Sequence, residues 1–338
     1  MAAVLGALCL ANLAFFWWYY PRPAAETHAV RLTIEPPQQG IVSTLSVSPD
    51  GRRVVYGAPN ADGNKILWLR SLDFLSAQPL PGTDNPFFTT FWSPDSRHVA
   101  FVSSSDNKLK KVDLASGGAP QVLANAPNGR GGTWNRDGVI VFAPSAAGPL
   151  YRISAAGGEI TPVTTIDESR RDVSHRYPWF LPDGRHFLYL VRGAAGDDTA
   201  IYVGSLDSKE TKRLVTAQSG GIYSPPGYLL YVRDETLVAH TFDAETLELK
   251  GEALSIAGAS VGFDLTSNLR GSPFPIMACS CITAALNLTK RNCSGSIERE
   301  NRRVHSEVLQ VIAIFASLRM RSVSPSGDMT RGRVGISG

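Results

Sequence analysis

The sequence predicts an all-β fold, a β-propeller built of four-stranded blades. A short turn recurs at intervals of 42 to 46 residues, and each copy lies between two apolar, β-prone strands. Two more short strands complete each interval before the next turn. Four short strands per period of this length are typical of propeller blades. The five turns begin at Ser48, Ser93, Asn135, Leu181 and Ser224.

The turn residues explain why the chain reverses at these points. The first copy reads Ser48-Pro49-Asp50-Gly51, in which Pro presets φ, Asp bonds nearby backbone and Gly supplies a positive φ. An aromatic residue comes just before four of the turns. The strands expected after the turns are residues 53–56, 98–101, 139–142, 186–189 and 228–231.

The rest of each unit supplies the outer half of a blade. The third strands are expected at 66–69, 109–112, 150–153, 201–203 and 237–240, and the fourth at 78–80, 121–123, 161–163, 212–214 and 253–255. A β-sandwich would not repeat its turn chemistry at fixed intervals, and β-helix coils are shorter. The strand-like residues 28–34 can complete the last blade and remove a sheet edge. The predicted propeller therefore spans 28–263.

The N-terminal residues predict a membrane anchor. Residues 2–20 are apolar apart from Asn12 and end in the aromatic run 15–20. Nineteen residues are enough to span a bilayer, and such an aromatic cluster is typical of the membrane interface. We expect a transmembrane helix over 1–20, a linker over 21–27 and an extracytoplasmic propeller. The alternative is a cleaved signal peptide, although the basic n-region and cleavage site are missing.

The C-terminal residues depart from the repeat after about Ala259. No turn occurs near position 270, and three of the four cysteines lie in this region, at Cys279, Cys281 and Cys293. Residues 265–338 contain ten Lys/Arg and four acidic residues, a net charge of +6. Because the whole chain has a net charge of +3, the other residues carry a net charge of −3. That balance argues against nucleic acid as a partner of the propeller. We expect 264–338 to be an aberrant tail, either out of frame or disordered.

Codon degeneracy supports the out-of-frame interpretation. The possible codons of residues 271–282 can be read in a displaced frame, in which each new codon begins at the third base of a present one. In that frame, the bases that encode Met277 and Ala278 must encode a glycine. The stretch is then compatible with F-S-V-S-D-N-G-V-L-V-Y, the missing turn and its strand. The same offset over 293–301 permits L-W-F-D-R-A-G-K. We therefore predict five recognisable blades and a sixth lost to a frame change between about Ala259 and Gly271.

No catalytic, metal or cofactor site is predicted. The chain lacks the H-R-D and D-F-G motifs of a kinase, and we expect no G-x-S-x-G nucleophile elbow of a peptidase. The histidines show no metal spacing. Recurring Trp92, Trp134 and Trp179 favour packing between blades over a pocket.

A ligand-binding role is assigned to the longest polar loop, Asp167 to Trp179, because recognition tends to reside in loops on a rigid scaffold. Its candidate binding residues are Arg170, His175, Arg176 and Tyr177. The alternative is a solvated loop with one Arg–Asp pair.

The repeat units resemble the WD40-like, TolB-type (PD40) propeller. Several stretches resemble, more narrowly, the extracytoplasmic propeller of bacterial membrane-bound serine/threonine kinases. The resemblance covers residues 1 to about 263, and the stretches that carry it are 32–37, 129–140, 180–189 and 202–208.

The resemblance implies a membrane-anchored, non-catalytic sensor or protein-interaction module whose kinase domain is absent here. Its partner would be an unknown protein, peptide or small ligand on a propeller face. The alternatives are a soluble periplasmic TolB-like scaffold and the detached propeller of a peptidase.

Overall fold

The computed structural model describes residues 42–260 except 75, 196–197 and 235. Its strands form five four-stranded antiparallel sheets, each built of consecutive strands. Blade 1 contains β1 (Thr44–Val47), β2 (Arg53–Pro59), β3 (Lys65–Ser71) and β4 (Ala77–Leu80). Blade 2 contains β5 (Pro86–Trp92), β6 (His98–Ser103), β7 (Lys108–Asp113) and β8 (Gln121–Asn125). Blade 3 contains β9 (Gly132–Trp134), β10 (Val139–Phe142), β11 (Tyr151–Ser154) and β12 (Thr161–Pro162).

Blade 4 contains β13 (Asp172–Phe180), β14 (His186–Gly193), β15 (Ala200–Ser205) and β16 (Lys212–Thr216). Blade 5 contains β17 (Ile222–Ser224), β18 (Tyr228–Arg233), β19 (Thr236–Asp243) and β20 (Glu248–Ser260). A short 3-10 helix, η1 (Glu168–Arg170), precedes blade 4. The five predicted blades are confirmed, because each predicted strand overlaps the strand observed at its place.

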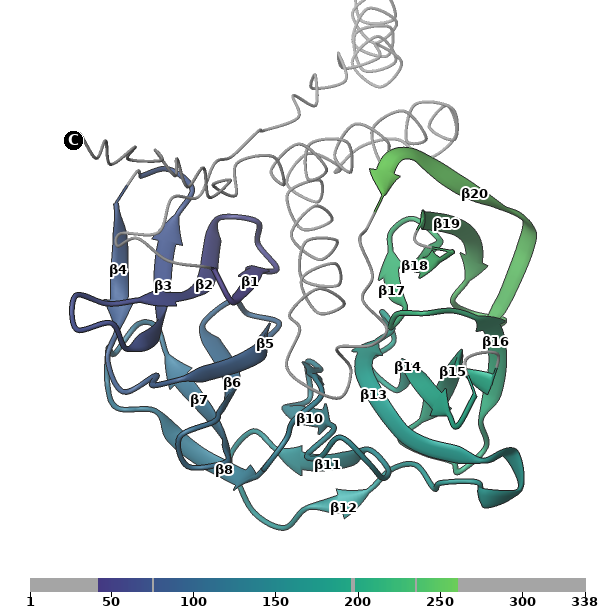
Figure 1. Ribbon diagram of the computed structural model, residues 1–338, viewed down its shortest axis with the longest axis horizontal. Coiled ribbons are helices and arrows are strands. Elements are labelled where there is room, and N and C mark those ends of the chain that lie inside the picture. Colours follow the sequence, from purple (N-terminus) through teal and green to yellow (C-terminus); the bar gives the residue numbers. More distant parts are fainter. Residues whose placement is uncertain (1–41, 75, 196–197, 235, 261–338) are drawn as a thin grey trace, which may run out of the picture.

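The blades follow one another around an arc in chain order, with the first strand of each toward the centre and the fourth toward the outside (Figure 1). The inner strands contact in succession, β1 with β5, β5 with β9 and β9 with β13. The outer strands are the most exposed, as in β4 and β8, where two or more side chains face solvent. This is the arrangement of propeller blades around a central axis.

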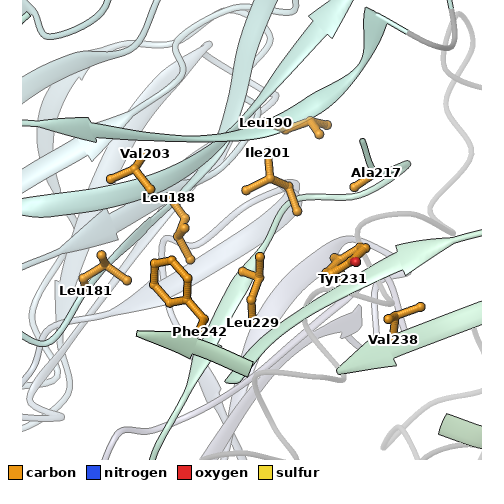
Figure 2. Packing of buried hydrophobic residues seen from close by; sticks show 10 residues of the cluster. All are labelled: Leu181, Leu188, Leu190, Ile201, Val203, Ala217, Leu229, Tyr231, Val238 and Phe242. Atoms are coloured by element: carbon orange, nitrogen blue, oxygen red, sulfur yellow. The ribbon is translucent and has the colours of Figure 1, made fainter. Parts of the chain in front are cut away.

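Apolar side chains fill the space between neighbouring blades. Because strand residues alternate between two faces, each blade presents one apolar set to the blade before it and one to the blade after it. Figure 2 shows the set between blades 4 and 5, where Leu188 and Ile201 face Leu229 and Tyr231. Similar two-sided clusters join blades 1 and 2, blades 2 and 3, and blades 3 and 4.

The recurring turns are stabilised by their first residue. In blade 1 the Ser48 hydroxyl accepts from the Arg53 amide at 2.9 Å and donates to Asp50 at 2.5 Å. Gly51 has φ of 68°, a conformation that other residues rarely adopt. These local bonds explain why the turn pattern alone located the blades.

Neighbouring turns are also joined to each other. In blade 3, Asn135 takes the place of the serine, and its side-chain oxygen accepts from the Asp137 and Val139 amides. Its amide nitrogen donates to the Gly184 carbonyl of the blade 4 turn at 2.8 Å. In blade 2, the Ser96 hydroxyl accepts from the Asp50 amide of blade 1 at 3.1 Å. The turns therefore form a hydrogen-bonded end to the propeller, called here the turn face.

One predicted loop is a strand. Residues 167–179, expected to be a polar loop, form η1 and most of β13, the inner strand of blade 4. The polar residues misled the prediction because contacts with blade 3 satisfy them inside the structure. The Arg176 guanidinium, for example, donates to Ala146 O, and His175 Nδ1 lies 2.7 Å from the Thr164 hydroxyl.

The predicted anchor, linker, first strand (28–34) and tail (264–338) lie outside the described residues. Within residues 42–260, apart from the gaps given above, no helix is long and apolar enough to cross a membrane.

Candidate functional site

A central cavity of about 830 Å³ lies among the inner strands and opens toward the turn face. All five described blades contribute to its wall. The lining segments are 46–47 and 49–50 of blade 1, 89–92 and 94–96 of blade 2, 131–137 of blade 3, 177–184 of blade 4, and 221–223 and 225 of blade 5. A cavity of this size falls in the range that binds small molecules or a short peptide segment.

The turn face gives the cavity a negative rim. Its charged lining residues are Asp50, Asp95, Asp137 and Asp183, with Arg136 as the one cation among the described lining residues. Burial by itself would raise the pKa of Asp50, but hydrogen bonds from the Ser48 hydroxyl and the Arg52 amide bring it below its usual value. The rim is therefore charged at neutral pH.

Asp95 and Asp183 are held in the same way. Partial burial would raise both pKa values, whereas a side-chain hydrogen bond, from Ser93 and from His186 respectively, lowers them. The Arg97 amide bonds Asp95, and the Arg185 amide bonds Asp183. Asp95 is thus held by the turn of blade 2, and Asp183 is held by the turn of blade 4.

Aromatic residues line the cavity wall below this rim. The residues that precede the turns, Trp92, Trp134, Trp179 and Tyr223, all contribute to it. The same residues also pack between blades, as the recurrence predicted: Trp92 is buried in the cluster between blades 1 and 2, and Trp134 packs on the cluster between blades 2 and 3. They therefore pack between blades, as expected, and also line a cavity, which the sequence disfavoured.

Tyr177 occupies a strained position in the wall. Its φ is 51°, in the left-handed region that bulky residues seldom adopt. A Cβ atom at Gly131 would lie 3.0 Å from the Tyr177 Cα, and one at Gly220 would lie 2.7 Å from its Cβ. Glycines at these two positions let Tyr177 fit between the inner parts of blades 3 and 5.

The four predicted binding residues do not form one site. Tyr177 lines the cavity, whereas Arg170 lies at the exposed η1, where it pairs with Asp167 and Asp172 at 3.0 and 3.1 Å. His175 is 1% exposed, and its Nδ1 lies 2.7 Å from the Thr164 hydroxyl. Its ring packs edge-on against Tyr189, and burial lowers its pKa.

Arg176 is 3% exposed, and its guanidinium donates to Ser174 Oγ and Ala146 O. Ligand binding by these four residues stays a prediction. The cavity itself was not predicted. The glycine pairs Gly131-Gly132 and Gly220-Gly221 were the available signal, because Gly131 and Gly220 make room for Tyr177, and Gly132 and Gly221 make room for side chains of neighbouring strands.

One sequence pattern needs correction. Gly258 to Gly262 reads G-A-S-V-G and matches the letters of a G-x-S-x-G nucleophile elbow, contrary to the expectation above. A nucleophile elbow needs a sharp turn between a strand and a helix. Ser260 instead lies opposite Thr236 in the ladder between β19 and β20. No group of three or more His, Cys, Asp or Glu residues in the described part of the chain is arranged to hold a metal.

Comparison with solved structures identifies the fold. TolB from Acinetobacter baumannii is 13% identical, with a TM-score of 0.50 over 63% of this chain and 56% of that chain. The putative TolB from Agrobacterium tumefaciens is 15% identical, with a TM-score of 0.44 over 52% of this chain and 65% of that chain. The matched part therefore covers less than two thirds of either structure.

No protein-family model and no curated protein matches the chain. The fold is that of a TolB-type β-propeller, as the repeat units predicted.

Proposed function

We propose that this chain is a non-catalytic binding propeller whose central cavity receives a basic segment of a protein or peptide partner. Residues 2–20 anchor it in a membrane, and the propeller lies outside the cytoplasm as the sensor half of a receptor of the kinase-linked type. The anchoring rests on the apolar run of residues 2–20 and on the sequence resemblance, and the kinase association rests on the resemblance alone. The cavity, with its charged rim and aromatic wall, is the observation that supports binding.

The chemistry of the cavity favours a cationic partner. The described lining residues include four carboxylates and one guanidinium, and Asp50 also lies 3.9 Å from Arg53 outside the lining, so the lining itself carries net negative charge that attracts cations. Trp and Tyr rings in the wall offer flat surfaces to a Lys or Arg side chain, an interaction of about 0.5–2 kcal/mol per contact. Because the lining comes from five rigid blades, the cavity is preformed and loses little entropy when a partner binds.

A lysine-rich peptide tests this binding. We expect the full chain to bind a short Lys-rich peptide more tightly than a Glu-rich peptide of equal length, with affinity falling as salt rises. The D137N substitution should weaken that binding at least threefold, because it removes one rim charge. D62N, in the exposed β2–β3 hairpin, is the matched control and should leave the affinity unchanged. Equal binding of the two peptides, measured by fluorescence anisotropy, would contradict the proposal.

Membrane fractionation tests the anchor. The full chain expressed in a bacterium should sediment with the membranes, resist extraction by salt and alkaline carbonate, and dissolve in detergent. A variant that lacks residues 2–20 should be soluble and should still bind the peptide. If the full chain instead appears as a shorter soluble periplasmic form, residues 1–20 are a signal peptide, and the soluble TolB-like alternative holds.

A further inference from the structure

Three arginines lie near Tyr177, which lines the cavity, but none of the three lines it. Arg130 lies two residues before β9, Arg176 in β13 and Arg192 in β14. Arg130 O accepts the Tyr177 amide at 2.8 Å. Ser174 faces Arg192 across the β13–β14 ladder and accepts from Arg176 Nε at 2.7 Å. One hydrogen bond and one ladder position thus place all three arginines around the same strand.

The electrostatics show that the three guanidinium groups lie close enough to repel one another. Burial is the main cause that lowers the pKa of Arg176, to about 10, and the charges of Arg192 and Arg130 lower it further. A hydrogen bond with the Tyr177 side chain raises the pKa of Arg176 and so favours its charged form. Burial together with the charge of Arg192 also lowers the pKa of Arg130. Like charges held this close are unfavourable unless a negative group joins them.

Arg130 and Arg192 have no carboxylate partner among the described residues. Arg130 donates to Asn128 and Gly129 carbonyls and to the Asn128 side chain, and it lies over the Phe87 ring at 5.3 Å. Arg192 forms no ion pair within the described part of the chain. Three exposed arginines, Arg97, Arg171 and Arg185, each pair with an aspartate at 2.7–2.8 Å.

The backbone at Tyr177 supplies a second, independent sign of a binding site. Its left-handed conformation interrupts the β13–β14 register between Arg176 and Trp179. Strain of this kind tends to occur at ligand sites. Here it turns the chain so that Tyr177 lines the cavity while Arg176 stays beside Ser174.

We propose that the cluster of Arg130, Arg176 and Arg192 binds an anionic oxygen group, a phosphate or a carboxylate, of a small ligand. Guanidinium groups suit this chemistry because their planar donors match such oxygens in pairs. The bound anion would neutralise the crowded positive charge. This site is separate from the acidic rim and does not rest on the peptide-binding proposal.

Anion titration tests the site. Purified full chain in detergent is titrated with inorganic phosphate or with succinate at constant ionic strength, with chloride as the reference ion, and thermal unfolding and calorimetry are recorded. We expect a saturable rise in the unfolding temperature with phosphate or succinate and none with chloride. Preference between the two anions shows which group the natural ligand carries. If neither anion gives a saturable rise, the proposal is wrong.

Two variants separate binding from a structural role. R192Q should weaken anion binding at least fivefold, yet in chloride alone it should unfold no lower than the parent because it removes a repulsion. R185Q, which loses the exposed pair with Asp207, is the matched control and should keep the parent affinity. An R192Q protein that unfolds lower in chloride, or that binds anions as the parent does, would overturn the assignment. R192Q should still bind the lysine-rich peptide and D137N should still bind phosphate, so either proposal can fail alone.

Discussion

Replacing Phe187 with alanine should lower the free energy of unfolding by about 3–5 kcal/mol, the usual cost of removing a buried aromatic ring. Phe187 is fully buried in the cluster that joins blades 3 and 4. Its ring meets Phe180 edge-on at 6.1 Å and lies 5.8 Å from the Tyr189 ring. A Cβ atom at Gly204 would lie 2.9 Å from the ring, so glycine there makes room for it. Alanine would leave a cavity that this close packing cannot fill.

Urea denaturation measures the effect of this substitution. Phe187→Leu should cost less than alanine, because it keeps most of the apolar volume. Phe74→Ala is the control, since Phe74 is 67% exposed, and it should change stability by less than about 0.5 kcal/mol. A cost below about 1 kcal/mol for Phe187→Ala would show that blades 3 and 4 are not joined through this cluster.

Restoring the displaced reading frame should raise the thermal unfolding midpoint by about 10 °C. The change is one inserted base between the codons of Ala259 and Gly271. The midpoint of a domain of this size moves by about 2–4 °C per kcal/mol, so the rise corresponds to several kcal/mol. The added stability would come from a sixth blade packed between blades 5 and 1.

The two terminal blades carry the apolar faces that such a blade would contact. On blade 1, the side chains of Val54, Tyr56 and Trp68 form a cluster that includes no residue of another described blade. On blade 5, Leu230 and Val232 are buried but are not part of the cluster shared with blade 4. Every other contact between neighbouring described blades uses apolar side chains from both. A sixth blade would pack against both of these faces.

Differential scanning calorimetry of the two translated chains makes the comparison. A two-base insertion at the same place gives the third reading frame and should not raise the midpoint. Genomic DNA supplies an independent check. Stop codons in the displaced frame across residues 271–301, or a frame-restored chain that unfolds no higher than the parent, would rule out the lost blade.

The repeat could be predicted from the sequence because its signals are local. Ser48 bonds to atoms two and five residues away, and Gly51 adopts its turn conformation without help from distant residues. The same hydroxyl bonds recur at Ser93, the Asn135 amide replaces them in blade 3, and Leu181 keeps only its backbone bonds. A pattern of this kind specifies hairpins and their spacing, and equal spacing of four-stranded units leaves few folds other than a propeller.

The candidate site could be predicted only in part. Arg176 and Tyr177 were selected because they are polar or aromatic residues in a polar stretch, but the stretch is an inner strand and not a loop. His175 was selected for the same reason, yet Thr164 and Tyr189 enclose it. Composition indicates where polar groups occur along the chain, whereas their burial depends on neighbours from other blades.

The sequence alone specified the turns, the strands and the four-stranded unit, because these depend on residues within a few positions of one another. The tertiary structure decided where the cavity lies, which carboxylates form its rim and which arginines meet behind Tyr177. More than forty residues separate each rim carboxylate from the next, and Arg130 from Arg176 and Arg192 of blade 4. Only the packing of one blade on the next brings them together, since apolar contacts between blades set the distance and direction that no local pattern records.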